Sequence, residues 1–293
     1  MSLVELDRLF GLSSCFSGAT YAGWTTDLAV TAPLALGLVL YVAGVTRLWH
    51  SAGPGRGASY WQVAAFAAGW LCMAAALLSP LHDLSRRIFT AHMMEHELVM
   101  TIAAPLLVLG RPLGPLLWAF PQRWRRPIAN GAKISAWWLG WDVLTRPFVA
   151  AVLHGAAIWL WHVPVLFDAA LQVEWLHWAQ HLSFLVTALF FWWTILERPL
   201  TRPAGSAILT LFATALHTGF LGILITLTPK PIYALQSRDA ALWNLGPLSD
   251  QQLAGLIMWV PGGMVYAIAA LILAGLWISR SSGRSALEPR HVH

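Results

Sequence analysis

The chain has 293 residues, of which 58% are hydrophobic, only 11% are charged and 18 are tryptophan. A soluble domain of this length would need far more charge, so the composition excludes an ordinary soluble globular protein and indicates an integral membrane protein. The net charge of +5 is accounted for by basic loops on one side of the membrane, described below, and does not call for a nucleic acid partner.

Seven apolar stretches, taken in chain order, predict seven membrane-spanning helices. They lie at 27–48, 60–80, 88–109, 147–163, 175–196, 206–228 and 252–278. The fourth is at the lower length limit for a span. We therefore expect an all-α integral membrane protein, a bundle of seven transmembrane helices. Its parts would be an outer N-terminal segment at 1–26, a membrane domain at 27–280 and a cytoplasmic tail at 281–293.

The distribution of Lys and Arg predicts the orientation. With the N-terminus outside, the inner segments hold 13 of these residues and the outer segments hold 5. Because basic loops favour the cytoplasmic side, we expect the N-terminus outside and the C-terminus in the cytoplasm. The stretch RPLGPLLWAFPQRWRRP at 111–127 contributes most to this difference, and predicts a basic, Trp-bearing segment at the membrane interface.

Two histidine pairs with a spacing of four residues stand near the outer ends of predicted spans. His92 and His96 belong to the third helix, and His177 and His181 to the fifth. Residues four apart lie on one face of a helix, so the two pairs can direct four nitrogens to one interior point. Burying four polar rings is costly without a common partner, so the pairs predict a metal site.

The other histidines are distributed by depth. His162 is expected at the outer end of the fourth helix, His82 in an outer loop and His50 on the inner side. His154 and His217 fall near the midplane, where a single histidine serves either as a ligand or as a hydrogen-bonding residue between helices. The sequence leaves that choice open.

Sulfur and carboxylate groups lie in compatible places. Met100 continues the His92–His96 stripe by four residues, and Met258 on the seventh helix reaches a similar depth. Imidazole with thioether favours copper, particularly Cu(I), although histidine alone fits zinc equally well. Three acidic residues toward the outside are expected behind the ligands or at the mouth of the site, where they would attract a cation: Glu95, Asp168 and Asp250.

Three other functions compete with this interpretation. The residues 92–96 spell HxxEH, typical of a membrane metalloprotease in which Glu95 would be the general base, but a third ligand is not apparent. A haem-binding or electron-transfer protein would use one histidine from each of two helices. A structural scaffold would use the histidines only for hydrogen bonds between helices.

Four long motifs carry a resemblance to a known family. They are HMMEHELVMTIAAPLLVLGRPL at 92–113, WHVPVLFDAAL at 161–171 with HWAQHLSFLVTALFFWW at 177–193, ALHTGFLGILITLTPKPIY at 215–233 and SDQQLAGLIMWVPGGMVY at 249–266. In order and content they resemble the CtaG family of cytochrome c oxidase assembly factors, which are seven-helix bacterial membrane proteins. The resemblance runs from about the second helix to the last.

The resemblance implies a role in maturing a haem-copper terminal oxidase by holding or delivering copper in the bacterial inner membrane. The implied partners are the oxidase subunit that carries copper and other oxidase assembly proteins, together with the lipid bilayer. No catalytic turnover is implied, so we do not expect an enzyme. The family pattern falls on His92, His96, His162, His177, His181, His217, Asp250, Gln251, Gln252 and Met258.

We therefore predict copper binding at a histidine site in the outer leaflet. The first expected ligands are His92, His96, His177 and His181, followed by His162 and Met258, and then by His217 and Met100. Mixed His and Met coordination of Cu(I) would allow transfer one ligand at a time, whereas four nitrogens fixed around Cu(II) would hold the ion too tightly.

Overall fold

The structure is a computed structural model that describes residues 23–25, 27–131, 135–197, 204–233 and 235–285. Within these residues the regular secondary structure is entirely helical, as predicted. Most of the expected outer segment 1–26, and residues 286–293 of the expected tail, lie outside the described residues. Residues 281–285 continue the last helix.

Among the described residues, six helices are long and apolar enough to cross a membrane. They are α3 (Leu28–Ala52), α4 (Tyr60–Leu77), the continuous run α6–η1–α7 (Phe89–Leu109), α13 (Glu174–Leu196), α14 (Ala204–Leu227) and the run α15–η3–α16 (Pro247–Ser285). They account for six of the seven predicted spans. The chain is therefore a multi-pass membrane protein.

The fourth predicted span, 147–163, differs from the expectation. Helix α11 (Pro147–Trp161) has only 15 residues and is followed, after a bend of 76°, by α12 (Pro164–Gln172). Pro164 is the first residue of α12 and disfavours a helical conformation of Val163 before it, which ends the straight helix. The count is six spans, or seven if this bent pair forms one.

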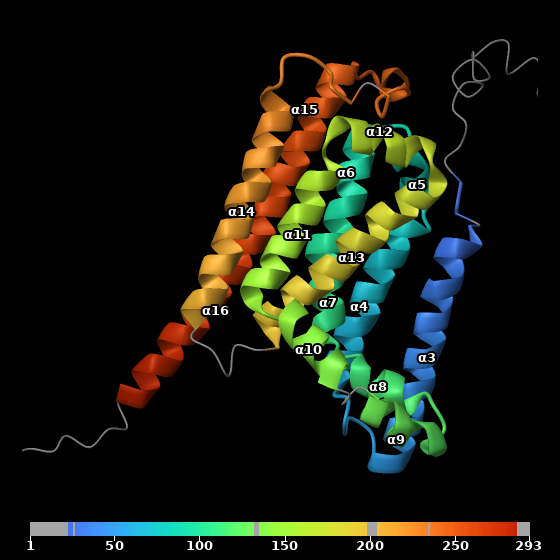
Figure 1. The fold of residues 1–293 in the computed structure, drawn as a ribbon, viewed down its shortest axis with the longest axis vertical. Helices are drawn as coiled ribbons and strands as arrows, with labels where there is room; N and C mark the ends of the chain where they lie inside the picture. The colour runs from blue at the N-terminus through green and yellow to red at the C-terminus, as the bar shows by residue number, and fades with distance from the viewer. Residues whose placement is uncertain (1–22, 26, 132–134, 198–203, 234, 286–293) are drawn as a thin grey trace, which may run out of the picture.

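Short helices occupy the two ends of the bundle, as Figure 1 shows. Helices α5 (Pro80–Ser85) and α12 lie at one end, here called the α5 end. Helices α8 (Leu113–Trp118), α9 (Gln122–Gly131) and α10 (Ser135–Leu144) lie at the opposite end, here called the α8 end. The Arg125 guanidinium stacks over the Trp118 ring at 4.0 Å, so the basic, Trp-bearing stretch forms compact helices at the α8 end.

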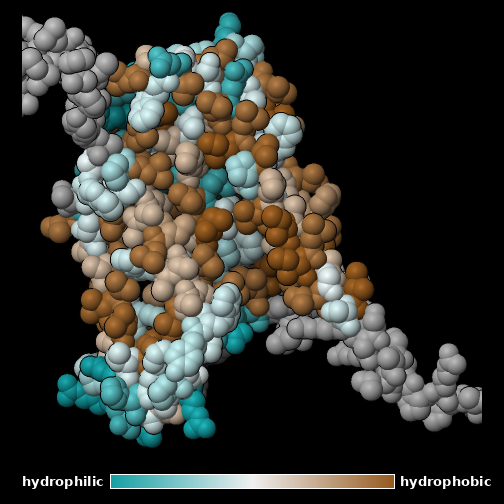
Figure 2. Space-filling model, turned by 180° about the vertical axis from the view of Figure 1, so that it is seen from behind, coloured by the Kyte–Doolittle hydropathy of each residue, from teal (hydrophilic) through white to brown (hydrophobic). Residues whose placement is uncertain are grey.

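The core lies where α6, α13, α15 and α16 meet. Phe89, Phe191, Trp192 and Tyr266 are almost fully buried there, and the Trp192 and Tyr266 rings stack at 5.7 Å. Two spans change to π-helix in the middle, at η1 (Leu98–Ala103) and η3 (Met258–Gly262). Large apolar side chains cover the middle of the surface and polar ones gather toward the ends (Figure 2), as a lipid environment requires.

Helix α3 stands at the edge of the bundle. Near its α8 end, the Tyr41 ring stacks on Phe66 at 3.5 Å, and Gly44 lies so close to the Pro115 carbonyl that a side chain there would collide with it. Helix α3 is thus anchored mainly through its second half.

Candidate metal site

The start of helix α6 is fixed by a side chain from the other end of the sequence. Asp250 accepts hydrogen bonds from the backbone nitrogens of Phe89 (2.8 Å) and Thr90 (2.9 Å), and from the Ser237 hydroxyl (2.6 Å). The residue before the helix, Ile88, has no side chain that can satisfy these first-turn donors. Asp250 is therefore the cap of α6, and it acts by holding the helix that carries His92 and His96.

The first histidine pair is buried in α6, with both residues 1% exposed. The two rings meet edge to face with centroids 4.1 Å apart. The Nδ1 atom of His92 lies 3.2 Å from the Ser85 carbonyl oxygen, but its Nε2 atom and both nitrogens of His96 have no hydrogen-bond partner among the described residues. Each buried polar atom without a hydrogen-bond partner lowers the free energy of unfolding by about 1–3 kcal/mol. Three such nitrogens side by side therefore indicate that they bind a ligand.

The second pair faces the first from α13. His177 and His181 stack with their Nε2 atoms 2.7 Å apart, so one nitrogen donates a hydrogen bond to the other. The rings of His96 and His181 are 5.0 Å apart, and those of His92 and His177 are 6.1 Å apart. The fold thus brings all four paired histidines into one cluster between α6 and α13.

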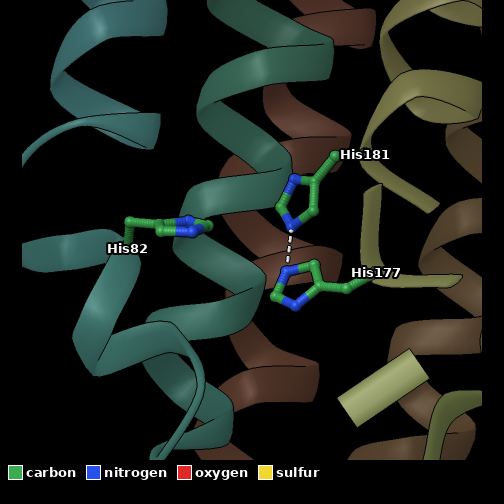
Figure 3. A group of neighbouring side chains, drawn as sticks. All are labelled: His82, His177 and His181. Carbon is green, nitrogen blue, oxygen red and sulfur yellow. Dashed lines mark hydrogen bonds between the residues drawn. The ribbon is translucent and has the colours of Figure 1, made fainter. Parts of the chain in front are cut away.

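A fifth histidine joins this cluster, and sequence reasoning missed it. His82 was expected in an outer loop, but it lies in helix α5 and is only 6% exposed. Figure 3 shows its ring pointing toward His177 and His181. One ligand atom from each of the three lies within 4.8 Å of the others, and Glu95 accepts a hydrogen bond from the His82 Nδ1 atom at 2.6 Å. A carboxylate in that position fixes the ring and leaves the other nitrogen for a metal.

A metal would require a small movement of the second pair. Two nitrogens on one tetrahedral metal, at bond lengths of about 2.0–2.1 Å, lie roughly 3.3 Å apart. The observed 2.7 Å between His177 and His181 is a hydrogen-bond distance instead. A shift of one ring nitrogen by less than about 1 Å would turn this hydrogen-bond distance into the spacing of two ligands. The His82 ring, whose ligand atom lies within 4.8 Å of the other two, would complete a group of three.

Comparison with known proteins identifies the family. Residues 39–280, most of the chain, match the family of cytochrome c oxidase caa3 assembly factors (Caa3_CtaG). This chain belongs to that family. The resemblance seen in the sequence motifs is thereby confirmed.

Two curated mycobacterial proteins are similar to this chain. "Uncharacterized protein Mb0105" of Mycobacterium bovis and "Uncharacterized protein MT0111" of Mycobacterium tuberculosis are each 28% identical to it over 285 residues. The match covers 92% of this chain and 41% of each relative, so the chain spans about two fifths of their length. No solved structure matches significantly.

His162 lies close to the cluster but behind aromatic rings. It ends α11, and its Nδ1 atom is 2.6 Å from the Ile158 carbonyl oxygen, whereas its buried Nε2 atom has no partner among the described residues. Phe167 and Phe184 stand next to its ring at 6.3 and 6.4 Å, and the same two rings contact His92 and His96. His162 is therefore one aromatic layer away from the paired histidines.

A tyrosine in the α14–α15 connection holds the end of α11. The Tyr233 hydroxyl donates a hydrogen bond to the His162 carbonyl oxygen at 2.5 Å. Burial raises the pKa of this hydroxyl, and the nearby Asp168 carboxylate raises it further, so Tyr233 keeps the proton that it donates. Asp168 itself lies on α12 and has one buried oxygen without a partner among the described residues. These contacts position the bend after α11.

The predicted thioether ligands lie deeper than the cluster. Met100 is in η1 and Met258 in η3, and both belong to the buried apolar core. The Trp192 indole donates a hydrogen bond to the Met100 carbonyl oxygen at 2.9 Å, so this segment of backbone is engaged in packing. The two sulfurs thus come from the π-helical interruptions of two spans.

The two midplane histidines also lie outside the cluster. His154 has a partner for each nitrogen, the Thr187 hydroxyl at 3.2 Å and the Tyr266 hydroxyl at 3.3 Å, and so serves as a hydrogen-bonding residue between helices. His217, half-buried on α14, accepts a hydrogen bond from the Trp159 indole at 3.4 Å. Both histidines are occupied by contacts between helices.

Proposed function

We propose that this assembly factor binds copper at the histidine cluster and helps to load the metal centre of a haem-copper terminal oxidase. The observation that carries the proposal is the convergence of ligand atoms from His82, His177 and His181 within 4.8 Å. Beside them lies His96, whose two buried ring nitrogens have no hydrogen-bond partner in the described part of the chain. Membership of a cytochrome c oxidase assembly family supports a role in oxidase maturation. The histidine cluster offers the nitrogen ligands that copper binding in this role would need.

Copper is the metal that this donor set and family favour together. Neutral imidazole binds copper and zinc, and divalent copper exceeds zinc in affinity at most nitrogen sites. His82, His177 and His181 would provide three imidazole ligands, and His92 and His96 would provide two more. With five imidazoles close together, the ion could exchange its ligands one at a time. Met100, farther along the span that carries His92 and His96, and Met258, on the last span, offer softer donors, which would favour Cu(I). The protein would carry the ion as cargo and need no catalytic turnover.

A polar pocket supplies a way in from the aqueous side. It has a volume of about 370 Å³ at the α5 end, and His82 forms part of its wall. Three carboxylates, from Asp27, Asp83 and Glu174, face two guanidinium groups there, and Arg87 is paired with Asp83 at 3.4 Å. The excess of acidic groups at this mouth would attract a cation toward His82.

The proposed orientation places this mouth in the periplasm and the α8 end in the cytoplasm. Helix α9 carries three arginines at the α8 end, which fits the cytoplasmic excess of basic residues. Reporter fusions in a bacterial host should therefore show residue 130 on the cytoplasmic side, and residues 170 and 240 on the periplasmic side. A cytoplasmic reporter at residue 170 would put the histidine cluster on the wrong side for metal arriving from outside.

Metal analysis of the purified protein tests the proposal directly. Protein made without a polyhistidine tag, with His291 and His293 replaced by alanine, should bind one or more copper ions per chain. A variant with alanine at His82, His177 and His181 should bind none. An absorption spectrum of the same sample separates the haem alternative, since a bound haem would give an intense Soret band. The copper proposal would be refuted if the wild-type protein contained no copper after incubation with Cu(I). It would also be refuted by a Soret band with the intensity of one haem per chain.

A further inference from the structure

Two adjoining cavities lie between α3 and the neighbouring helices α4 and α13. The one nearer the α5 end has a volume of about 470 Å³, and the one nearer the α8 end about 430 Å³. Both are lined by Pro33, Leu34, Met73 and Leu185, so they meet at these four residues. Together they form one elongated space, here called the α3 cavity, that follows α3 along the bilayer.

The walls of the α3 cavity are apolar along nearly their whole length. Side chains of leucine, valine, proline and aromatic residues line it from α3, α4, α7, α8 and α13. Polar side chains enter only at its α5 end, where His82 and His181 of the histidine cluster form part of the wall. His82 also lines the polar mouth, so the apolar space and the aqueous pocket meet at this residue.

The cavity exists because α3 packs closely against its neighbours only along its second half. Its second half packs closely through Tyr41 and Gly44, whereas its first half contains Pro33, which removes one helical hydrogen bond. Between these parts, the Trp70 indole on α4 donates a hydrogen bond to the Leu34 carbonyl oxygen at 3.1 Å. This bond sets the distance between the two helices at the middle of the cavity.

The size and chemistry of the cavity decide what can occupy it. Water is excluded because a stable buried water needs two to four polar partners. A membrane-spanning helix of a partner protein is too large, since a cylinder 10 Å wide and 30 Å long occupies roughly 2,400 Å³, whereas the two halves of the cavity measure about 470 and 430 Å³. A hydrocarbon chain is narrow, long and apolar, and the bilayer supplies it at high concentration.

We propose that the α3 cavity is a binding site for one acyl chain of a membrane phospholipid. The methyl end of the chain lies toward Pro112 and Leu116 on the α8 side, and its ester end lies at the level of His82, next to the polar mouth. In this position the chain covers the side of His181 that faces α3. The bound lipid thus closes the histidine cluster against the bilayer and leaves the aqueous mouth as its opening.

Gly37 allows a direct test, because it lines the cavity and a Cβ atom added there meets nothing within 4 Å. Gly37→Phe places an aromatic ring on the α3 wall, where it takes up part of the space that an acyl chain would occupy. Gly275→Phe is the matched control, since it adds the same ring to open space on α16. Leu185→Trp narrows the shared middle of the cavity from the α13 side and gives an independent variant.

The experiment uses the full chain without metal, so it does not depend on the copper proposal. Each protein is reconstituted with a phosphatidylethanolamine that carries a diazirine near the end of one acyl chain. It is then solubilised, washed with detergent and irradiated, so that only retained lipid reacts. Wild type and Gly275→Phe should carry the label on α8 or on the parts of α3 and α13 that face it, whereas Gly37→Phe and Leu185→Trp should lose it.

Two results would overturn the inference. One is equal labelling of all four proteins, which would mean that the retained lipid lies elsewhere. The other is the identification, in an extract of washed wild-type protein, of an isoprenoid or a peptide in place of a phospholipid. Circular dichroism of each variant must show an unchanged helix content before its label is compared.

Discussion

Replacing His181 with alanine should lower the affinity for Cu(I) by at least about 100-fold, the upper end of the effect seen for residues that only support a ligand. His181 lies at the centre of the cluster, hydrogen-bonded to His177 and 5.0 Å from the ring of His96. His96→Ala should have a comparable effect, and the double variant should lose little more, because ligands of one ion act as a unit. Competition titration of the purified protein against a Cu(I) chelator measures all three.

Two variants serve as controls for that series. His154→Ala removes another buried histidine, whose nitrogens are bonded to Thr187 and Tyr266, and should leave copper affinity unchanged while lowering stability. His50→Ala, on the exposed last turn of α3, should have no effect on either. Unchanged affinity in His181→Ala or His96→Ala would remove that residue from the metal site, and additive losses in the double variant would indicate two separate sites.

In cells, deletion of the protein should lower the activity of the haem-copper oxidase although the oxidase polypeptides are still made. The variant with alanine at His92, His96, His177 and His181 should match the deletion, because the histidines would carry the function. Excess copper in the medium should restore part of the activity, since a higher metal concentration loads the target by mass action. Oxidase turnover, copper content and subunit abundance in isolated membranes are the measurements.

The quadruple variant also separates copper delivery from a scaffold role. Its helices should insert normally, because replacing neutral histidine with alanine does not reduce the hydrophobicity of the segments. Western blotting of membranes checks that the protein is present. Normal oxidase activity in cells that contain the quadruple variant would contradict copper delivery and favour a scaffold.

The membrane spans could be read from the sequence because hydropathy reports directly on the bilayer. The histidine pairs could be found for a similar reason, since a spacing of four residues within one helix fixes their common face. The bend after Trp161 was signalled only by Pro164, which gives the position of a break but not its angle of 76°. Local sequence patterns therefore predict the helices, whereas the angles between them follow only from the three-dimensional structure.

His82 and Asp250 show what the sequence could not reveal. His82 meets His177 and His181 only because Ser79 and Pro80 begin a short helix that turns back over the bundle. Asp250 looks like part of its own helix start, yet its carboxylate caps α6. Both contacts join segments far apart in the chain, and no periodicity within either segment encodes them.

The capping of α6 by Asp250 has a consequence for biogenesis. The third span emerges from the ribosome long before the last one, and domains form as their parts become available. Until residues 247–257 are in the membrane, the first-turn nitrogens of Phe89 and Thr90 lack the acceptor that they have in the finished protein. The helix that carries His92 and His96 therefore gains its cap only late in synthesis, after the last span has entered the membrane.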